Sequence, residues 1–242
     1  MEELIEIARW SPLTGLIERH LDRTGCLLEA GCGLGQYVLL LRARGFRAVG
    51  TDWSFEAVRK GARAGGPLAV MDLRALGVRA GSVSTYLSLG VVEHDPEGPD
   101  AILREAARVL RPGGTLLISV PYWNGVRRLL GPYIARSSAR TAASGGQFYQ
   151  YAFSRWEVRA FLGAHGFTVR SFHPYDPARL LRTARRALVR SSTPSAGQTP
   201  REGATRRSER RGLPVRALRA LLYTPPSLRL LGHMILAVAE RA

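Results

Sequence analysis

The sequence predicts an α/β fold in which a mostly parallel sheet is covered by helices on both faces. Short apolar runs alternate with amphipathic segments from residue 26 to residue 120, the pattern of strands joined by right-handed helical crossovers. Hydrophobic residues make up 45% of the 242 positions, which is enough to fill a core and excludes a wholly disordered chain. The two cysteines, Cys26 and Cys32, are too few for a disulfide framework.

Seven segments are predicted as strands because each is a short, largely apolar run. They are residues 26–30, 47–51, 68–71, 83–89, 115–120, 167–173 and 233–239. The last strand is expected to run antiparallel to its neighbours. This arrangement is a Rossmann-like, seven-stranded sheet.

Helices are predicted between these strands from their start and stop signals. Ser11 is the N-cap and Pro12 the first residue of a helix that is predicted to extend to about Leu21. Ser154 and Glu157 form a capping box that opens a helix to about His165. The other predicted helices span 36–44, ended by Gly45, then 54–62, capped by Ser54, and 99–110, ended by the Arg-Pro-Gly-Gly run at 111–114.

One domain is expected to comprise residues 1–175 and 232–242, with its core at 25–121. Residues 176–231 read as a basic insertion between the last two strands. Within it, residues 191–212 are rich in Ser, Thr, Pro, Gly and Arg and are predicted to be disordered.

The net charge of +16 is concentrated in the insertion. Residues 171–242 carry 14 basic and 4 acidic residues, a net of +10, against 21 and 15, a net of +6, in residues 1–170. Arginines 179–190 lie on a predicted basic amphipathic helix, and 179–219 is a candidate for peripheral contact with an anionic membrane or a phosphorylated substrate. Because Lys60 is the only lysine, arginine-rich codon usage explains the charge equally well.

No signal peptide and no run of 18 apolar residues is visible. The expected location is therefore the cytoplasm, with or without peripheral contact with a membrane.

The most informative motif is the turn Glu29-Ala30-Gly31-Cys32-Gly33-Leu34-Gly35, which joins a strand to a helix. Such a turn lets bare backbone approach a nucleotide-like ligand. A dinucleotide loop would place its third glycine at position 36, which is Gln36. Glu29 would repel a pyrophosphate but suits a ligand with an ammonium group.

Two further acids follow the next strands. Asp52 lies 21 residues after Gly31, where a carboxylate can accept both hydroxyls of a ribose. Asp72 ends the third strand and is placed to accept an adenine amine. Three acids at successive strand ends, together with the glycine turn, form a specific constellation.

These stretches, with 88–95 and the Glu105–Pro121 block, resemble class I S-adenosylmethionine-dependent methyltransferases, of the small-molecule type related to the ubiquinone-biosynthesis enzymes. The resemblance covers residues 25–121 well and 150–175 loosely. It implies S-adenosylmethionine as cofactor and S-adenosylhomocysteine as product. The residues that it implies in cofactor binding are Glu29, Gly31, Cys32, Gly33, Gly35, Asp52, Trp53, Asp72, Leu73, Leu89 and Gly90.

The acceptor side is less defined. His94, which follows the fourth strand, is the candidate general base for a hydroxyl or protonated amine acceptor. Glu93 could orient it or bind a metal, although no metal is expected. Residues 122–156 hold 8 of the 19 aromatic residues, so residues 122–153 are predicted to form a lid with a hinge at Gly145-Gly146.

The expected activity is methyl transfer to a small molecule such as a lipid-linked, quinone-like or sugar intermediate. A nucleic-acid methyltransferase is the first alternative. Residues 89–92 read Leu-Gly-Val-Val, however, where amino-methylating nucleic-acid enzymes usually carry Asn/Asp-Pro-Pro-Tyr/Phe. The second alternative is a non-catalytic cofactor-binding module. The third is an NAD-dependent oxidoreductase, which Gln36 disfavours.

Overall fold

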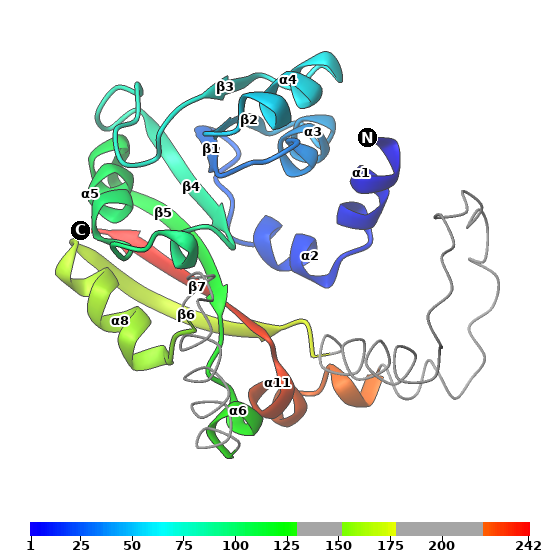
Figure 1. Ribbon diagram of the computed structural model, residues 1–242, viewed down its shortest axis with the longest axis vertical. Coiled ribbons are helices and arrows are strands. Elements are labelled where there is room, and N and C mark those ends of the chain that lie inside the picture. The colour runs from blue at the N-terminus through cyan, green and yellow to red at the C-terminus, as the bar shows by residue number, and fades with distance from the viewer. Residues whose placement is uncertain (130–151, 178–219) are drawn as a thin grey trace, which may run out of the picture.

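A computed structural model describes residues 1–129, 152–177 and 220–242 of the protein. A seven-stranded sheet of order β3-β2-β1-β4-β5-β7-β6 lies at its centre (Figure 1). The strands are β1 (Cys26–Ala30), β2 (Arg47–Asp52), β3 (Leu68–Val70), β4 (Val83–Leu89), β5 (Leu110–Pro121), β6 (Phe167–Tyr175) and β7 (Met234–Arg241). The first five pair in parallel, and β7 runs antiparallel to both β5 and β6. The predicted Rossmann-like sheet with an antiparallel last strand is confirmed.

Helices cover both faces of this sheet. They are α1 (Glu2–Arg9), α2 (Pro12–Glu18), α3 (Gln36–Ala43), α4 (Phe55–Arg63), the 3-10 turn η1 (Val92–His94), α5 (Asp100–Val109), α6 (Gly125–Leu129), α8 (Arg155–Ala164) and α11 (Pro225–Leu231). Helices α6 and α11 pack together beyond the carboxyl end of β5 (Figure 1). No helix in the described part of the chain is both long and apolar enough to span a membrane.

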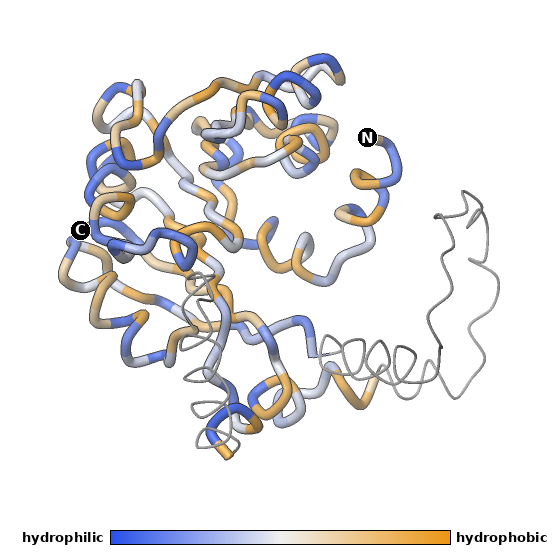
Figure 2. Tube along the Cα trace, viewed as in Figure 1, coloured by the Kyte–Doolittle hydropathy of each residue, from blue (hydrophilic) through white to orange (hydrophobic). Residues whose placement is uncertain are grey.

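Alternation along the strands divides the core into two apolar clusters. Leu28 on β1 and Tyr86 on β4 face the cluster that contains α5 and α8, whereas their neighbours Leu27 and Leu87 face the one that contains α2 and α3. Both faces of the strands are therefore apolar, as expected for a sheet that is covered on both sides. Figure 2 shows the resulting apolar colour along the central strands.

The element boundaries differ from prediction at several places. Helix α2 ends at Glu18 rather than near Leu21, and α1, which has no sequence prediction, precedes it. Strand β5 begins at Leu110, because the Arg-Pro-Gly-Gly run makes an irregularity within the strand instead of a turn before it. Pro225 and Pro226, expected in the insertion, occupy the first turn of α11. Residues 130–151 of the predicted lid, the 179–190 helix and the 191–212 segment lie outside the described residues.

Two helical glycines provide a test of the packing. A Cβ at Gly61 in α4 would lie 2.4 Å from the Leu34 carbonyl oxygen of the glycine turn, whereas one at Gly163 in α8 would meet nothing within 4 Å. We expect Gly61→Ala to lower the free energy of unfolding by about 1–3 kcal/mol through overpacking. Gly163→Ala should raise it by about 0.5–1 kcal/mol, since alanine favours the helix. Urea denaturation of both variants measures this; equal effects would contradict the close α4 contact.

Candidate functional site

The glycine turn is held against β2 by backbone hydrogen bonds. The N–H groups of Gly31 and Cys32 both donate to the Thr51 carbonyl, at 2.8 and 3.0 Å. Gly31 has φ +79°, and a Cβ there would lie 2.4 Å from a methyl group of Val91. Because both the backbone conformation and the available space exclude a side chain, the turn requires glycine at this position.

Asp52 fixes the other side of the turn. One carboxylate oxygen accepts the Gly33 N–H at 2.8 Å, and the other accepts the Ser54 N–H at 2.9 Å. Ser54 in turn caps α4, its hydroxyl accepting the Ala57 N–H. A carboxylate offers about four acceptor positions, so Asp52 keeps capacity for hydroxyl donors of a ligand.

A cleft of ≈ 740 Å³ opens at the carboxyl ends of β1 to β4. It brings together seven of the predicted site residues: Gly31, Asp52, Trp53, Asp72, Leu73, Gly90 and His94. Sequence reasoning missed the other lining residues, which are Val70, Met71, Arg74, Val91, Asp95, Pro96 and Ile102. Apart from Ile102, these residues neighbour the predicted ones in the loops after β3 and β4, so strand-end position was the available signal.

The other predicted residues do not line the cleft: Glu29, Cys32, Gly33, Gly35 and Leu89. Cys32 is buried in the apolar cluster beneath α3, and burial raises the pKa of its thiol to about 12. This cysteine is therefore a neutral, small residue of the core rather than a nucleophile.

Glu29 is the most unusual group behind the turn. Its residue is only 3% exposed, and Oε2 has no hydrogen-bond partner. Burial raises the pKa of this carboxyl to about 8; the Val38 N–H opposes the shift, and Asp52 adds to it. A buried, unpaired carboxyl beside a glycine turn is suited to a cationic partner.

Asp72 is held by a partner that the sequence did not suggest. Arg74 donates to both of its carboxylate oxygens, with Nη2 at 2.9 Å, and these hydrogen bonds lower the pKa of Asp72. Both side chains are about half exposed, so the pair is weak and open to exchange. Trp53, 83% exposed, is an uncovered aromatic surface at the same cleft.

Glu93 and His94 both belong to the η1 turn, which points one inward and exposes the other. His94 is exposed and lines the cleft, whereas Glu93 is 2% exposed and its Oε2 has no hydrogen-bond partner. Burial raises the pKa of Glu93 to about 7. In the described ranges, no group of three or more His, Cys, Asp or Glu side chains could hold a metal ion.

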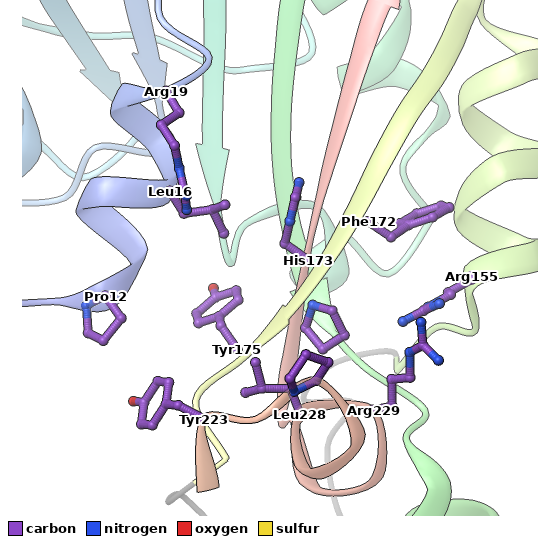
Figure 3. Close-up of a pocket in the computed structure, with 12 residues that line it drawn as sticks. Pro12, Leu16, Arg19, Arg155, Phe172, His173, Tyr175, Tyr223, Leu228 and Arg229 are labelled. Atoms are coloured by element: carbon purple, nitrogen blue, oxygen red, sulfur yellow. The ribbon is translucent and has the colours of Figure 1, made fainter. Parts of the chain in front are cut away.

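A second cavity of ≈ 360 Å³ lies at the same edge of the sheet, between α2, the end of β6 and α11 (Figure 3). Its lining residues are Pro12, Leu16, Arg19, Arg155, Phe172, His173, Pro174, Tyr175, Tyr223, Pro225, Leu228 and Arg229. Sequence reasoning did not find it, because these residues come from four separate segments without a shared motif.

Tyr175 relates the second cavity to polar side chains near the cleft. It lines the second cavity, and burial raises the pKa of its phenol, with further contributions from Tyr37 and Glu93. Glu93 lies near Gly90 of the cleft, because a Cβ on Gly90 would be 3.5 Å from Glu93 Oε1. Burial raises the pKa of Tyr37, on α3, and Glu29 next to the glycine turn raises it further. Tyr175 at the second cavity, Tyr37 and the two glutamates near the cleft are thus close enough to influence one another's pKa values.

Comparison with known proteins gives a family match. Residues 28–118 match the model of a methyltransferase domain. No curated protein matches the sequence.

Solved structures give a consistent fold. A SAM-dependent methyltransferase from Methanosarcina mazei is 17% identical, with TM-score 0.62 over 96% of this chain and 98% of that one. A complex between the Haloferax volcanii Trm112 methyltransferase activator and a proposed methyltransferase is 17% identical, with TM-score 0.61 over 98% of this chain and 91% of that one. Geranyl diphosphate C-methyltransferase from Streptomyces coelicolor, solved with Mg²⁺, geranyl diphosphate and S-adenosylhomocysteine, is 18% identical. Its TM-score is 0.59 over 94% of this chain and 79% of that one. At these identities, the likeness is one of fold.

The buried Glu29 carboxyl predicts a pH-dependent stability. Its pKa is about 8 in the folded protein and near 4.5 in the unfolded chain, so the folded state binds more protons between these values. The contribution of Glu29 to the free energy of unfolding therefore falls as the pH rises from about 5 to 8. Relative to wild type, Glu29→Gln should become progressively more stable across this window. Urea denaturation at pH 5, 6.5 and 8 checks this; a constant difference between the two proteins would contradict it.

Proposed function

We propose that this chain, whose residues 28–118 match a methyltransferase domain, is a class I S-adenosylmethionine-dependent enzyme that methylates a small-molecule acceptor by direct in-line displacement. The matched methyltransferase domain supports the enzyme class and S-adenosylmethionine as its cofactor, and the shared fold is consistent with both. The acceptor class is the new part of the statement.

The second cavity is the observation that supports a small-molecule acceptor. Its ≈ 360 Å³ suit a small organic molecule, and its lining residue Tyr175 is close enough to Glu93, near the cleft, for Glu93 to raise its pKa. The Streptomyces coelicolor structure, of the same fold, was solved with a small-molecule diphosphate bound. A lipid-linked, quinone-like or sugar intermediate would each be compatible with a cavity of this size.

The cleft residues fit the cofactor. Oε2 of Glu29, which has no hydrogen-bond partner, suits the methionine ammonium group, and Asp52 has acceptor capacity for the ribose hydroxyls. Asp72 would exchange Arg74 for the adenine amine, while Trp53 and Leu73 would flank the ring. The remaining proposed positions border the methionine chain through backbone or small side chains: Gly31, Cys32, Gly33, Gly35, Leu89 and Gly90.

The chemistry demands little of the protein beyond placement. The cofactor supplies an already electrophilic methyl group on its sulfonium. Cleft and second cavity would hold the two reactants in line, and such orientation can supply about 7–11 kcal/mol of the barrier. His94, exposed in the cleft, is the proposed base for a hydroxyl or ammonium acceptor, and its exposure would let the proton pass to water.

A pair of variants tests the base. His94→Ala should lower kcat about a hundredfold or more, within the range of general-base contributions, while S-adenosylhomocysteine affinity stays unchanged. Glu93→Gln, one residue away and buried, is the matched comparison. If His94→Ala retains full turnover and Glu93→Gln loses it, with a wild-type rate that rises through about pH 7, the base is Glu93 instead.

The acceptor class is tested with methyl-labelled S-adenosylmethionine and cell extract divided into low-molecular-mass, nucleic-acid and protein fractions. We expect label in the low-molecular-mass fraction, and its loss with Asp52→Ala, which removes the proposed ribose acceptor. Asp100→Ala, an exposed acid outside the cleft, should leave transfer unchanged. Label found only in nucleic acid or protein would overturn the small-molecule assignment. Binding of S-adenosylhomocysteine without any transfer would indicate a non-catalytic module.

A further inference from the structure

We infer that the second cavity binds the oxyanion of an elongated, otherwise apolar acceptor, either a carboxylate or a phosphate group. This inference rests on the proposed function, since it names the class of small molecule that the enzyme would methylate. It depends on the charge, the side-chain contacts and the position of the cavity.

The charged side chains among the described lining residues are basic. Arg19, Arg155 and Arg229 line the cavity, and no acidic residue of the described ranges does so. None of the three forms an ion pair with an acid of the described ranges. Several other arginines do so, among them Arg108 with Glu105 and Arg170 with Glu240. Three arginines without an acidic partner in the described ranges thus share one cavity, and a guanidinium is suited to carboxylate and phosphate.

Two of these guanidinium groups share one side of the cavity. Figure 3 shows Arg155, from the start of α8, and Arg229, from α11, reaching toward each other. Two like charges placed together repel each other unless an anion lies between them. In addition, Nε of Arg155 is buried and has no hydrogen-bond partner, although its guanidinium lies 5.6 Å from the Tyr122 ring centroid. An unsatisfied buried donor is costly, and a ligand oxygen would satisfy it.

Arg19, the C-cap residue of α2, adds a further positive charge to the lining of the same cavity. Burial lowers the pKa of His173, and the neighbouring His20 and Arg19 lower it further. Arg19 therefore lies close enough to raise the positive potential at the cavity wall. The His173 ring, whose Nε2 lies 2.8 Å from the Ser171 hydroxyl, is neutral and does not compete as a cation for the anion.

The rest of the lining is apolar or aromatic, from Pro12 and Leu16 on α2 to Phe172 and Leu228. These surfaces fit a hydrocarbon or ring system. Strand β6 lies three strand positions from β4, at the edge of the cofactor cleft, which at about 4.8 Å per strand is about 14 Å. An acceptor with its oxyanion at the arginines must therefore be elongated for its reacting atom to reach the cleft.

Binding of n-octyl phosphate, n-octanoate, n-octanol and n-octylammonium to the full chain tests the inference. Calorimetry should give affinities for the two anions at least tenfold higher than for the alcohol, and no binding of the ammonium compound. The comparison between octyl phosphate and octanoate identifies which oxyanion the site prefers. Equal affinity for the anions and the alcohol would overturn the proposal.

Arginine variants locate the site. Arg155→Met and Arg229→Met, which keep an apolar stem, should each weaken octyl phosphate binding about tenfold, and Arg229→Lys should restore part of the loss. Arg170→Met, on β6 but outside the cavity, is the matched control and should bind as wild type. Unchanged affinity in both cavity variants contradicts the assignment. Binding to anionic vesicles but not to octyl phosphate also overturns it, in favour of a membrane contact.

The proposed function and the anion site can be refuted independently of each other. Octyl phosphate binding requires no methyl transfer, so anion binding without label in low-molecular-mass fractions would refute the small-molecule methyltransferase and leave the anion site intact. Where labelled acceptor is found, the cavity variants should raise its KM about tenfold and leave kcat little changed. A fall in kcat alone would contradict a binding role for the arginines.

Discussion

The parallel pairing of the strands is the constraint on which both cavities depend. Because β1 to β5 run in one direction, their carboxyl ends and the loops that follow them meet at a single edge of the sheet. The antiparallel β7 then lets β6 run in that same direction, so Pro174 and Tyr175 also end there. One sheet edge thus carries the glycine turn, the acids after β2 and β3, and the second cavity.

The same edge contains two buried carboxyl groups whose charged forms are poorly stabilised by the protein. Glu29 and Glu93 are buried without a partner for one oxygen each, whereas Glu105 is held by Arg108. A fold selected for stability alone would have no reason to keep two such carboxyls behind adjacent strand ends. Their burial is understandable if ligands complete the environment that the protein leaves unfinished. The unpaired arginines of the second cavity are the basic counterpart of this arrangement.

How far the sequence predicts the structure depends on whether the signal is local. The seven strands and the site acids were predictable, because each follows from a short apolar run and the residue that ends it. Helix α1 lacked a side-chain cap, and β5 absorbed Arg111–Gly114 as an irregularity that only pairing with β4 defines. The Arg74 contact with Asp72 and the joining of α2, α8, β6 and α11 around one cavity depend on tertiary placement. No pattern within a single segment encodes either of them.

The position of Tyr175 explains why two cavities, rather than one large pocket, suit a methyl transfer. Direct displacement needs the acceptor atom, the methyl carbon and the sulfur in line, and water excluded from the path adds to the electrostatic control. Tyr175 lines the second cavity, close enough to Glu93 and Tyr37 for both to raise its pKa, and would place a polar group beside the acceptor body. Each reactant would then be fixed by its own end, the cofactor by acids and the acceptor by arginines. The opposite charge of the two lining sets would keep either ligand from occupying the other's place.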